Sequence, residues 1–184
     1  MNILKLSKQS LNKVVETLQK GGVVVCPTDT VYGFLADAGN KKVVEKIYKI
    51  KKRPRSKLLP VFVKDIKMAK SLAIIGEKQE KILNKKWPGK YTFVFNAKRK
   101  SGTVAIRIPK YKFLNDLLKK VNKPLVQTSV NISDEKPLSD IKEIIKVFAD
   151  ENKIDLIIDS GNLPKSKPSA IIDLTKQKIK ILRK

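Results

Sequence analysis

The segment from Val25 to Phe34 reads V-C-P-T-D-T-V-Y-G-F and places ligand-binding groups directly after an apolar run. Pro27 cannot donate a hydrogen bond to a sheet, so it ends the strand. Thr28, Asp29 and Thr30 then offer two hydroxyls and a carboxylate. Because ligands of α/β sheets bind at the carboxyl ends of strands, we expect a binding site here.

Two residues of this segment have alternative roles. Gly33 permits either a positive φ or the close approach of a ligand. Asp29 either takes part in binding or caps the turn, since aspartate is a common turn-forming residue. Both alternatives for Asp29 remain open at this point.

A cluster of basic residues follows a predicted helix. Lys51 to Lys57, K-K-R-P-R-S-K, holds five positive charges in seven residues. Such a run is often a solvated linker. The alternative is a phosphate-binding loop, for which the planar fork of Arg53 or Arg55 is well suited.

An arginine ends a second apolar strand. In T-V-A-I-R the side chains of Thr103, Ala105 and Arg107 share one face, because strand residues alternate between faces. A buried arginine is costly unless it meets an anion. Arg107 therefore either binds an anion or lies on an edge strand and reaches solvent.

Small polar residues close or begin two further strands. Thr128, Ser129 and Asn131 end one of them, either as binding groups or as a helix cap or turn. Ser169 precedes another and is either a binding group or an ordinary turn residue. The chain has no G-x-x-x-x-G-K-[ST] and no G-x-G-x-x-G sequence, so any nucleotide must be bound by groups dispersed over several strand ends.

The elements that must position these groups follow from hydrophobic periodicity. It predicts helices over 10–20, 42–51, 65–72, 77–86, 113–121 and 140–149. Strands are predicted over 23–26, 58–63, 91–96, 104–108, 125–129, 154–159, 170–174 and 179–182. Neighbouring strands within 91–108 and 170–182 are close enough in sequence to pair antiparallel, so we expect an α/β fold with a mixed parallel and antiparallel sheet. No domain boundary is evident, and we expect one domain over residues 1–184.

Composition excludes several classes of site. The chain of 184 residues has one cysteine, Cys26, and no histidine. A disulfide within the chain, a histidine-based catalytic triad and a cysteine or histidine metal site are therefore impossible. No run reaches the roughly 18 apolar residues of a membrane span, and no signal-peptide core is present. We expect a cytoplasmic protein that does not contact a membrane.

The net charge of +24 has two interpretations. Only five of the 41 basic residues are arginines, and most lysines alternate with apolar residues as on solvated helix faces. The lysine excess is then a consequence of an AT-rich genome. The same charge also produces a field that attracts nucleotides and RNA.

Six short motifs, taken in their order along the chain, resemble those of a known family. The sequences P-T-D-T-V-Y-G, I-K-K-R-P, W-P-G-K-Y-T, V-A-I-R-I-P, T-S-V-N-I-S and P-S-A-I-I-D closely resemble the YrdC-like family, the threonylcarbamoyl-AMP synthases. The match runs from about residue 10 to the C-terminus and resembles the short, single-domain form. It implies a twisted mixed sheet with flanking helices and a positively charged concave face.

The resemblance also implies a reaction. L-threonine, bicarbonate or CO2, and ATP would give L-threonylcarbamoyladenylate, pyrophosphate and water. That product supplies the N6-threonylcarbamoyl group of adenosine 37 in tRNA through downstream threonylcarbamoyl-transferase proteins. We expect Mg2+ as the cofactor, bound with ATP rather than in a protein metal site, with Asp29 as the main nearby acid.

The resemblance assigns roles residue by residue. Lys51 and Arg53 are expected to be catalytic and to face the phosphates. The threonine-binding residues would be Thr30, Arg107, Ser129 and Ser169. The ATP-binding residues would be Lys51, Arg53, Lys57, Thr103, Asn131, Ser139 and Arg183.

Two departures and two rival functions accompany this assignment. Phe62 stands where the longer enzymes often have a threonine-contacting histidine, and Asp159-Ser160-Gly161 replaces a common D-G-G. One rival is a catalytically idle, basic RNA-binding module of the same fold, although the chain lacks an evident cluster of aromatic residues for base stacking. The other is a carbamoyl-adenylate step in hydrogenase maturation, which normally uses a much longer chain.

Overall fold

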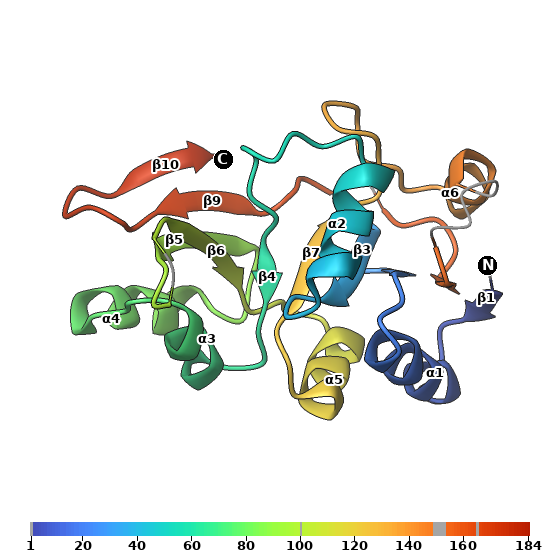
Figure 1. The fold of residues 1–184 in the computed structure, drawn as a ribbon, viewed down its shortest axis with the longest axis horizontal. Coiled ribbons are helices and arrows are strands. Elements are labelled where there is room, and N and C mark those ends of the chain that lie inside the picture. The colour runs from blue at the N-terminus through green and yellow to red at the C-terminus, as the bar shows by residue number, and fades with distance from the viewer. Residues whose placement is uncertain (1, 100, 149–153, 165) are drawn as a thin grey trace.

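The computed structural model describes residues 2–99, 101–148, 154–164 and 166–184. Within these residues ten strands form one sheet in the order β1-β8-β2-β3-β7-β4-β6-β5-β9-β10 (Figure 1). The strands are β1 (Asn2–Lys5), β2 (Val24–Cys26), β3 (Gly33–Asp37), β4 (Val61–Phe62), β5 (Tyr91–Asn96), β6 (Thr103–Arg107), β7 (Leu125–Ser129), β8 (Leu156–Asp159), β9 (Ala170–Asp173) and β10 (Lys180–Arg183). The helices are α1 (Lys8–Gln19), α2 (Lys41–Ile50), α3 (Ile66–Leu72), α4 (Glu77–Lys86), α5 (Lys112–Val121) and α6 (Ile141–Phe148).

Pairing within the sheet is mixed, as the sequence predicts. Strand β5 pairs antiparallel with β6 and parallel with β9, while β9 pairs antiparallel with β10. Strand β2 pairs antiparallel with β3 and parallel with β8. The predicted α/β class with a mixed sheet is confirmed.

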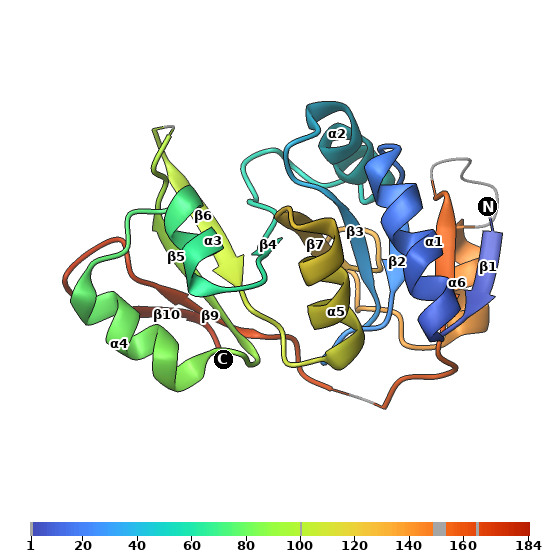
Figure 2. The same cartoon turned by 90° about the horizontal axis from the view of Figure 1, so that it is seen from below.

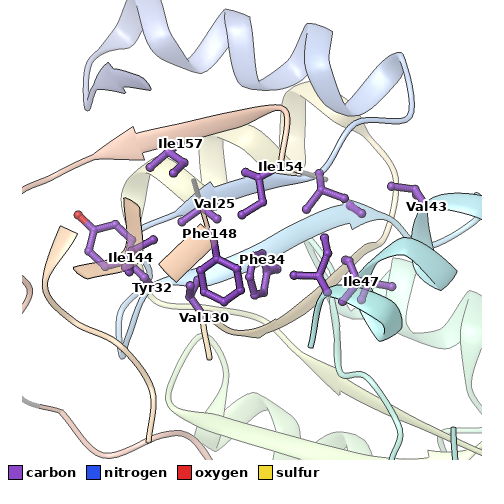
Figure 3. Packing of buried hydrophobic residues seen from close by; sticks show 14 of the residues in the cluster. Val25, Tyr32, Phe34, Val43, Ile47, Val130, Ile144, Phe148, Ile154 and Ile157 are labelled. Carbon is purple, nitrogen blue, oxygen red and sulfur yellow. The ribbon is translucent and has the colours of Figure 1, made fainter. Parts of the chain in front are cut away.

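Strands β8, β2, β3 and β7 form what we call the covered half, because helices pack on both faces. Helices α2 and α6 lie on one face and α1 and α5 on the other (Figures 1 and 2). Neighbouring residues of β2 divide between these layers, with Val25 facing α2 and α6 and Val24 facing α1 and α5. Figure 3 shows the first layer, in which the rings of Phe34 and Phe148 meet edge to face with centroids 5.3 Å apart.

Strands β6, β5, β9 and β10 form what we call the open half, in which helices of the described residues pack on one face only. Its apolar side chains, including Phe93, Phe95 and Ile106, pack against α3 and α4. The opposite face of the open half carries the alternate residues, among them Ala105 and Arg107.

Strand β4 joins the two halves, with Phe62 in the layer under α1 and α5 and Val61 in the layer under α3 and α4. Strand register places α3 and α4 on the same face of the sheet as α2 and α6, because Ile106 under α3 and α4 pairs with Val61, and Val61 pairs with Val126 of the layer under α2 and α6.

Two strands were not predicted. Strand β3 is apolar throughout because both of its faces are buried, so it shows no alternation, and it directly follows the polar segment. Strand β1 is a short edge strand whose four residues are all exposed. Neither sequence therefore has the period-two pattern of a half-buried strand.

Element boundaries also differ from the predictions. Helix α1 begins at Lys8 because Ser7 is its N-cap, with the Ser7 hydroxyl accepting a bond of 3.0 Å from the Ser10 amide. The strand predicted over 58–63 is reduced to Val61–Phe62, directly after Pro60, which has no amide proton for a ladder. The predicted end of the last helix, Ala149, lies outside the described residues.

Candidate functional site

A cavity of about 650 Å³ lies on the uncovered face of the open half, where it meets the ends of β2 and β7. Its floor includes Val94 of β5, Ala105 of β6 and Ile171 of β9. Loops after β2, α2 and β7 supply further walls. Nine of the eleven predicted site residues line it, namely Thr30, Arg53, Lys57, Thr103, Arg107, Ser129, Asn131, Ser169 and Arg183.

Arg107 and Asp29 form a buried ion pair at the cavity. Arg107 Nη2 donates to Asp29 Oδ2 at 2.6 Å, and the two side chains are only 2% and 8% exposed. Arg107 Nε donates to the Gly89 carbonyl at 2.9 Å. Burial lowers the pKa of Arg107, and Asp29 opposes this shift. The anion that a buried arginine requires is thus supplied by the strand-end segment of the same chain.

This pair decides between the alternatives for Arg107 and gives Asp29 a partner that neither of its two alternatives included. Asp29 Oδ2 also accepts from the Lys110 amide at 3.1 Å, so the carboxylate joins two loops around the arginine. Arg107 does not reach solvent from an edge strand, because β6 lies between β4 and β5. Arg107 also lines the cavity, whereas Asp29 does not.

The turn after β2 is organised by one hydroxyl. Thr28 Oγ1 donates to the Val31 carbonyl at 2.7 Å and accepts from the amides of Thr30 and Val31 at 3.1 and 3.2 Å. It also lies 3.0 Å from Thr30 Oγ1, which lines the cavity. Gly33 follows this turn, and the close approach predicted there is made by the protein, since a Cβ at Gly33 would lie 2.7 Å from Gln127 Nε2.

Lys51 lies beneath the cavity rather than in its wall. Its Nζ donates to the Ser129 carbonyl at 2.7 Å, to the Asn131 carbonyl at 2.9 Å and to Asn131 Oδ1 at 2.8 Å. These bonds use all three ammonium hydrogens, and the residue is 1% exposed. Burial, with a smaller effect of Arg53, lowers the pKa of Lys51 to about 7. In this structure Lys51 therefore braces the segment after β7, and its expected contact with the phosphates stays a prediction.

Two further arginines, Arg53 and Arg183, line the cavity. Arg53 donates to the carbonyls of Lys57 and Leu58 at 3.1 and 2.8 Å, which folds the α2–β4 loop around its guanidinium. Arg183 donates twice to the Ser169 carbonyl, at 3.0 and 2.8 Å. Burial lowers the pKa of both arginines, and Arg53 lowers that of Arg183 further. Two cations held this close together favour a polyanionic ligand.

The basic run is neither wholly a linker nor wholly a binding loop. Lys51 is buried and Arg53 half-buried, whereas Lys52 and Arg55 are exposed. Arg55 pairs with Glu45 and stacks over Tyr48, outside the residues that line the cavity. Of the five basic residues in this run, only Arg53 and Lys57 line the cavity.

Ser139, like Lys51, is a predicted site residue that does not line the cavity, whereas two carboxylates that were not predicted do. The carbonyl of Ser139 accepts a bond from the Leu163 amide, but Ser139 is not among the lining residues. Phe62 is fully buried, with its ring centroid 5.6 Å from Arg107 Cζ, and is likewise absent from the lining. Asp173 and Glu135 line the cavity. The alternation of P-S-A-I-I-D, which places Ile171 and Asp173 on one face, was a signal for Asp173.

The described residues contain no group of three or more cysteine, histidine or acidic side chains that could hold a metal ion. Asp29, the acid expected to lie nearest a metal, is bound to Arg107. Cys26 is fully buried and burial raises the pKa of its thiol, so it is a core residue rather than a nucleophile. Among the same residues, none of the helices is long and apolar enough to cross a membrane.

Comparison with known proteins agrees with this arrangement. Residues 16–184 match the family model Sua5_yciO_yrdC, described as "Telomere recombination". The whole chain aligns at 35% identity with 91% of a Methanocaldococcus jannaschii protein named "Putative threonylcarbamoyl-AMP synthase".

Solved structures share the fold. The chain superposes on E. coli YciO with a TM-score of 0.87 and 26% identity, covering all of this chain and 93% of that one. It superposes on P. abyssi Sua5 complexed with L-threonine with a TM-score of 0.88 and 27% identity, covering 99% of this chain and 56% of that one. The chain thus spans little more than half of the P. abyssi protein. With a family model that matches nearly its full length, the chain belongs to the Sua5/YciO/YrdC family.

Proposed function

We propose that the protein is a threonylcarbamoyl-AMP synthase. It would convert L-threonine, bicarbonate and ATP into L-threonylcarbamoyladenylate, pyrophosphate and water. The name of the M. jannaschii relative and the L-threonine complex of P. abyssi Sua5 support this assignment.

The observation that carries the proposal is that two chemically different groups of residues line one cavity. The first group, Arg107 with the hydroxyls of Thr30 and Ser129, suits the carboxylate and polar hydrogens of an amino acid. The second group, Arg53, Lys57 and Arg183, suits a triphosphate. A reaction that joins an amino acid to a nucleotide needs both groups in one space.

The chemistry needs positioning more than a nucleophilic side chain. The threonine amine would form a C–N bond with bicarbonate, releasing water and giving a carbamate. A carbamate oxygen would then attack the α-phosphorus of ATP, and the bond to the β-phosphate oxygen would break to release pyrophosphate. Arg53, Lys57 and Arg183 would neutralise the phosphates, while Lys51 would hold Ser129 and Asn131 in place.

The wider context follows from this activity. Mg2+ would enter as part of the MgATP substrate, because Mg2+ in nucleotide sites is bound largely by substrate phosphates and water. The product would pass to threonylcarbamoyl-transferase proteins acting on tRNA, which places the enzyme in the cytoplasm. A positively charged concave face and a direct contact with tRNA belong to the same proposal.

The test is formation of adenylate from radiolabelled L-threonine, bicarbonate and ATP. We expect Arg53→Ala to reduce the rate by about 100-fold or more, because an arginine that neutralises phosphate charge is lost. Arg55→Ala is the matched control, since Arg55 lies two residues away and outside the cavity lining. Its rate should stay within about twofold of wild type.

Different failures have different meanings. A wild-type Arg53→Ala rate would refute the phosphate role of Arg53 alone. Pyrophosphate release that does not depend on threonine would refute the proposed function. Binding of RNA by a protein that forms no adenylate would favour the idle RNA-binding module.

A further inference from the structure

The hydrogen of the Thr28 hydroxyl is already used. Thr28 Oγ1 donates it to the Val31 carbonyl at 2.7 Å, and a carbonyl oxygen can only accept. A hydrogen bond across the 3.0 Å contact between Thr28 Oγ1 and Thr30 Oγ1 therefore has Thr30 as its donor, and this hydrogen shares the Thr28 lone pairs with the amide hydrogens of Thr30 and Val31. With its hydrogen turned toward Thr28, Thr30 presents lone pairs to the cavity.

A second hydroxyl of the lining is polarised in the same way. Ser129 Oγ donates to Asn131 Oδ1 at 2.6 Å. The orientation of that amide is fixed, because Asn131 Nδ2 donates to the carbonyls of Ile132 and Glu135, both at 2.7 Å, and Oδ1 also accepts from Lys51. Ser129, like Thr30, therefore offers the cavity an acceptor.

Neither Thr28 nor Lys51 lines the cavity, yet each determines the hydrogen-bond polarity of a residue that does. Thr28 is 5% exposed and lies directly behind Thr30. Among the residues expected to bind the amino acid, the Arg107 guanidinium is then a donor, and the hydroxyls of Thr30 and Ser129 are acceptors. A ligand that fits these three residues must carry an acidic group together with N–H or O–H hydrogens.

We propose that Thr28 is a positioning residue that commits the Thr30 hydroxyl to accepting a hydrogen bond from the amino-acid substrate. This inference rests on the proposed function, in which the ligand is L-threonine or its N-carboxylate. Loss of the Thr28 hydroxyl removes the acceptor of the Thr30 hydrogen, so a substrate that donates to Thr30 leaves that hydrogen buried without a partner. Substrate binding weakens although no residue that touches the substrate has changed.

A double-mutant cycle on L-threonine affinity tests this coupling. We expect Thr30→Val to weaken binding measured by calorimetry about tenfold, the loss of one hydrogen bond. Thr28→Val should weaken it by about the same factor, and the double variant should be no weaker than Thr30→Val alone. Thr28→Ser, which retains the hydroxyl, should bind within about threefold of wild type.

The outcomes separate the two proposals. If the double variant binds about 100-fold more weakly than wild type, Thr28 acts independently of Thr30 and the inference is overturned. The same holds if Thr28→Val binds as wild type does, or if Thr28→Ser fails to restore affinity. If wild-type protein binds no L-threonine, the proposed function fails and the inference fails with it.

A measurement on the unmodified protein covers the case in which Thr28→Val does not fold. In NMR spectra, the hydroxyl protons of Thr28 and Thr30 should exchange slowly with water, and the Thr30 hydroxyl proton should show a contact with Thr28. Rapid exchange of the Thr30 hydroxyl proton would overturn the inference.

Discussion

The two halves of the sheet differ in what covers them, and that difference locates the site. In the covered half both faces are buried, so Val24 and Val25 enter two separate apolar layers. In the open half only one face is buried, and Ile106 packs under helices while its neighbours Ala105 and Arg107 face the cavity. The same backbone arrangement thus provides stability in one half and a binding surface in the other.

The first prediction tests whether stability resides in the covered half. Leu117 of α5 is fully buried, whereas Leu58 lines the cavity and is 43% exposed. We expect Leu117→Ala to lower the free energy of unfolding by about 2–5 kcal/mol. Leu58→Ala should change it by less than about 1 kcal/mol. Urea denaturation measures both, and similar losses for the two variants would contradict the division.

The second prediction compares two alanines on strands of the two halves. Ala36 of β3 is buried in the layer under α2 and α6, and Ala105 of β6 lines the cavity. Ala36→Leu should cost about 1–3 kcal/mol of stability through overpacking. Ala105→Leu should cost less than about 1 kcal/mol, because its added atoms extend into the cavity.

The same pair should behave in the opposite way in activity. Ala105→Leu should lower the rate of adenylate formation about tenfold or more, because it displaces the substrates from their aligned positions. Ala36→Leu, assayed below its unfolding temperature, should stay within about threefold of wild type. An active Ala105→Leu variant would show that the uncovered face is not the reaction site.

The third prediction concerns Lys51, which supports the segment after β7, the last strand of the covered half. Its pKa in the folded protein is about 7, against 10.5 as its ordinary value. Between these values the unfolded chain binds the proton and the folded protein does not, so this group makes stability rise with pH. We expect the difference in free energy of unfolding between wild type and Lys51→Met to shift by up to about 4 kcal/mol in favour of wild type from pH 6 to pH 10. A difference that does not change with pH would contradict this.

The sequence predicted best what depends on local pattern. The alternation of T-V-A-I-R placed Thr103, Ala105 and Arg107 on one face, and all three line the cavity. The prediction that Arg107, if buried, needs an anionic partner was also confirmed, by Asp29. Strand β3 could not be predicted this way, because a strand buried on both faces has no polar alternation.

The remaining site features depend on distant parts of the chain. No local pattern identifies Asp29 as the partner of Arg107, since 78 residues separate them. Lys51 and Arg53 are equally basic in sequence, and only the packing of the segment after β7 buries one and leaves the other at the cavity. The motif order brought the right segments together but could not say which side chain of each segment faces inward.

The ion pair between Asp29 and Arg107 also makes the arginines of the cavity unequal. Arg107 is neutralised by a carboxylate, whereas the acceptors that hold Arg53 and Arg183 are uncharged carbonyl oxygens. The uncompensated positive charge of these three arginines therefore belongs to Arg53 and Arg183. An asymmetric anion that enters the cavity turns its more highly charged part toward those two arginines, so its orientation is set before any close contact forms.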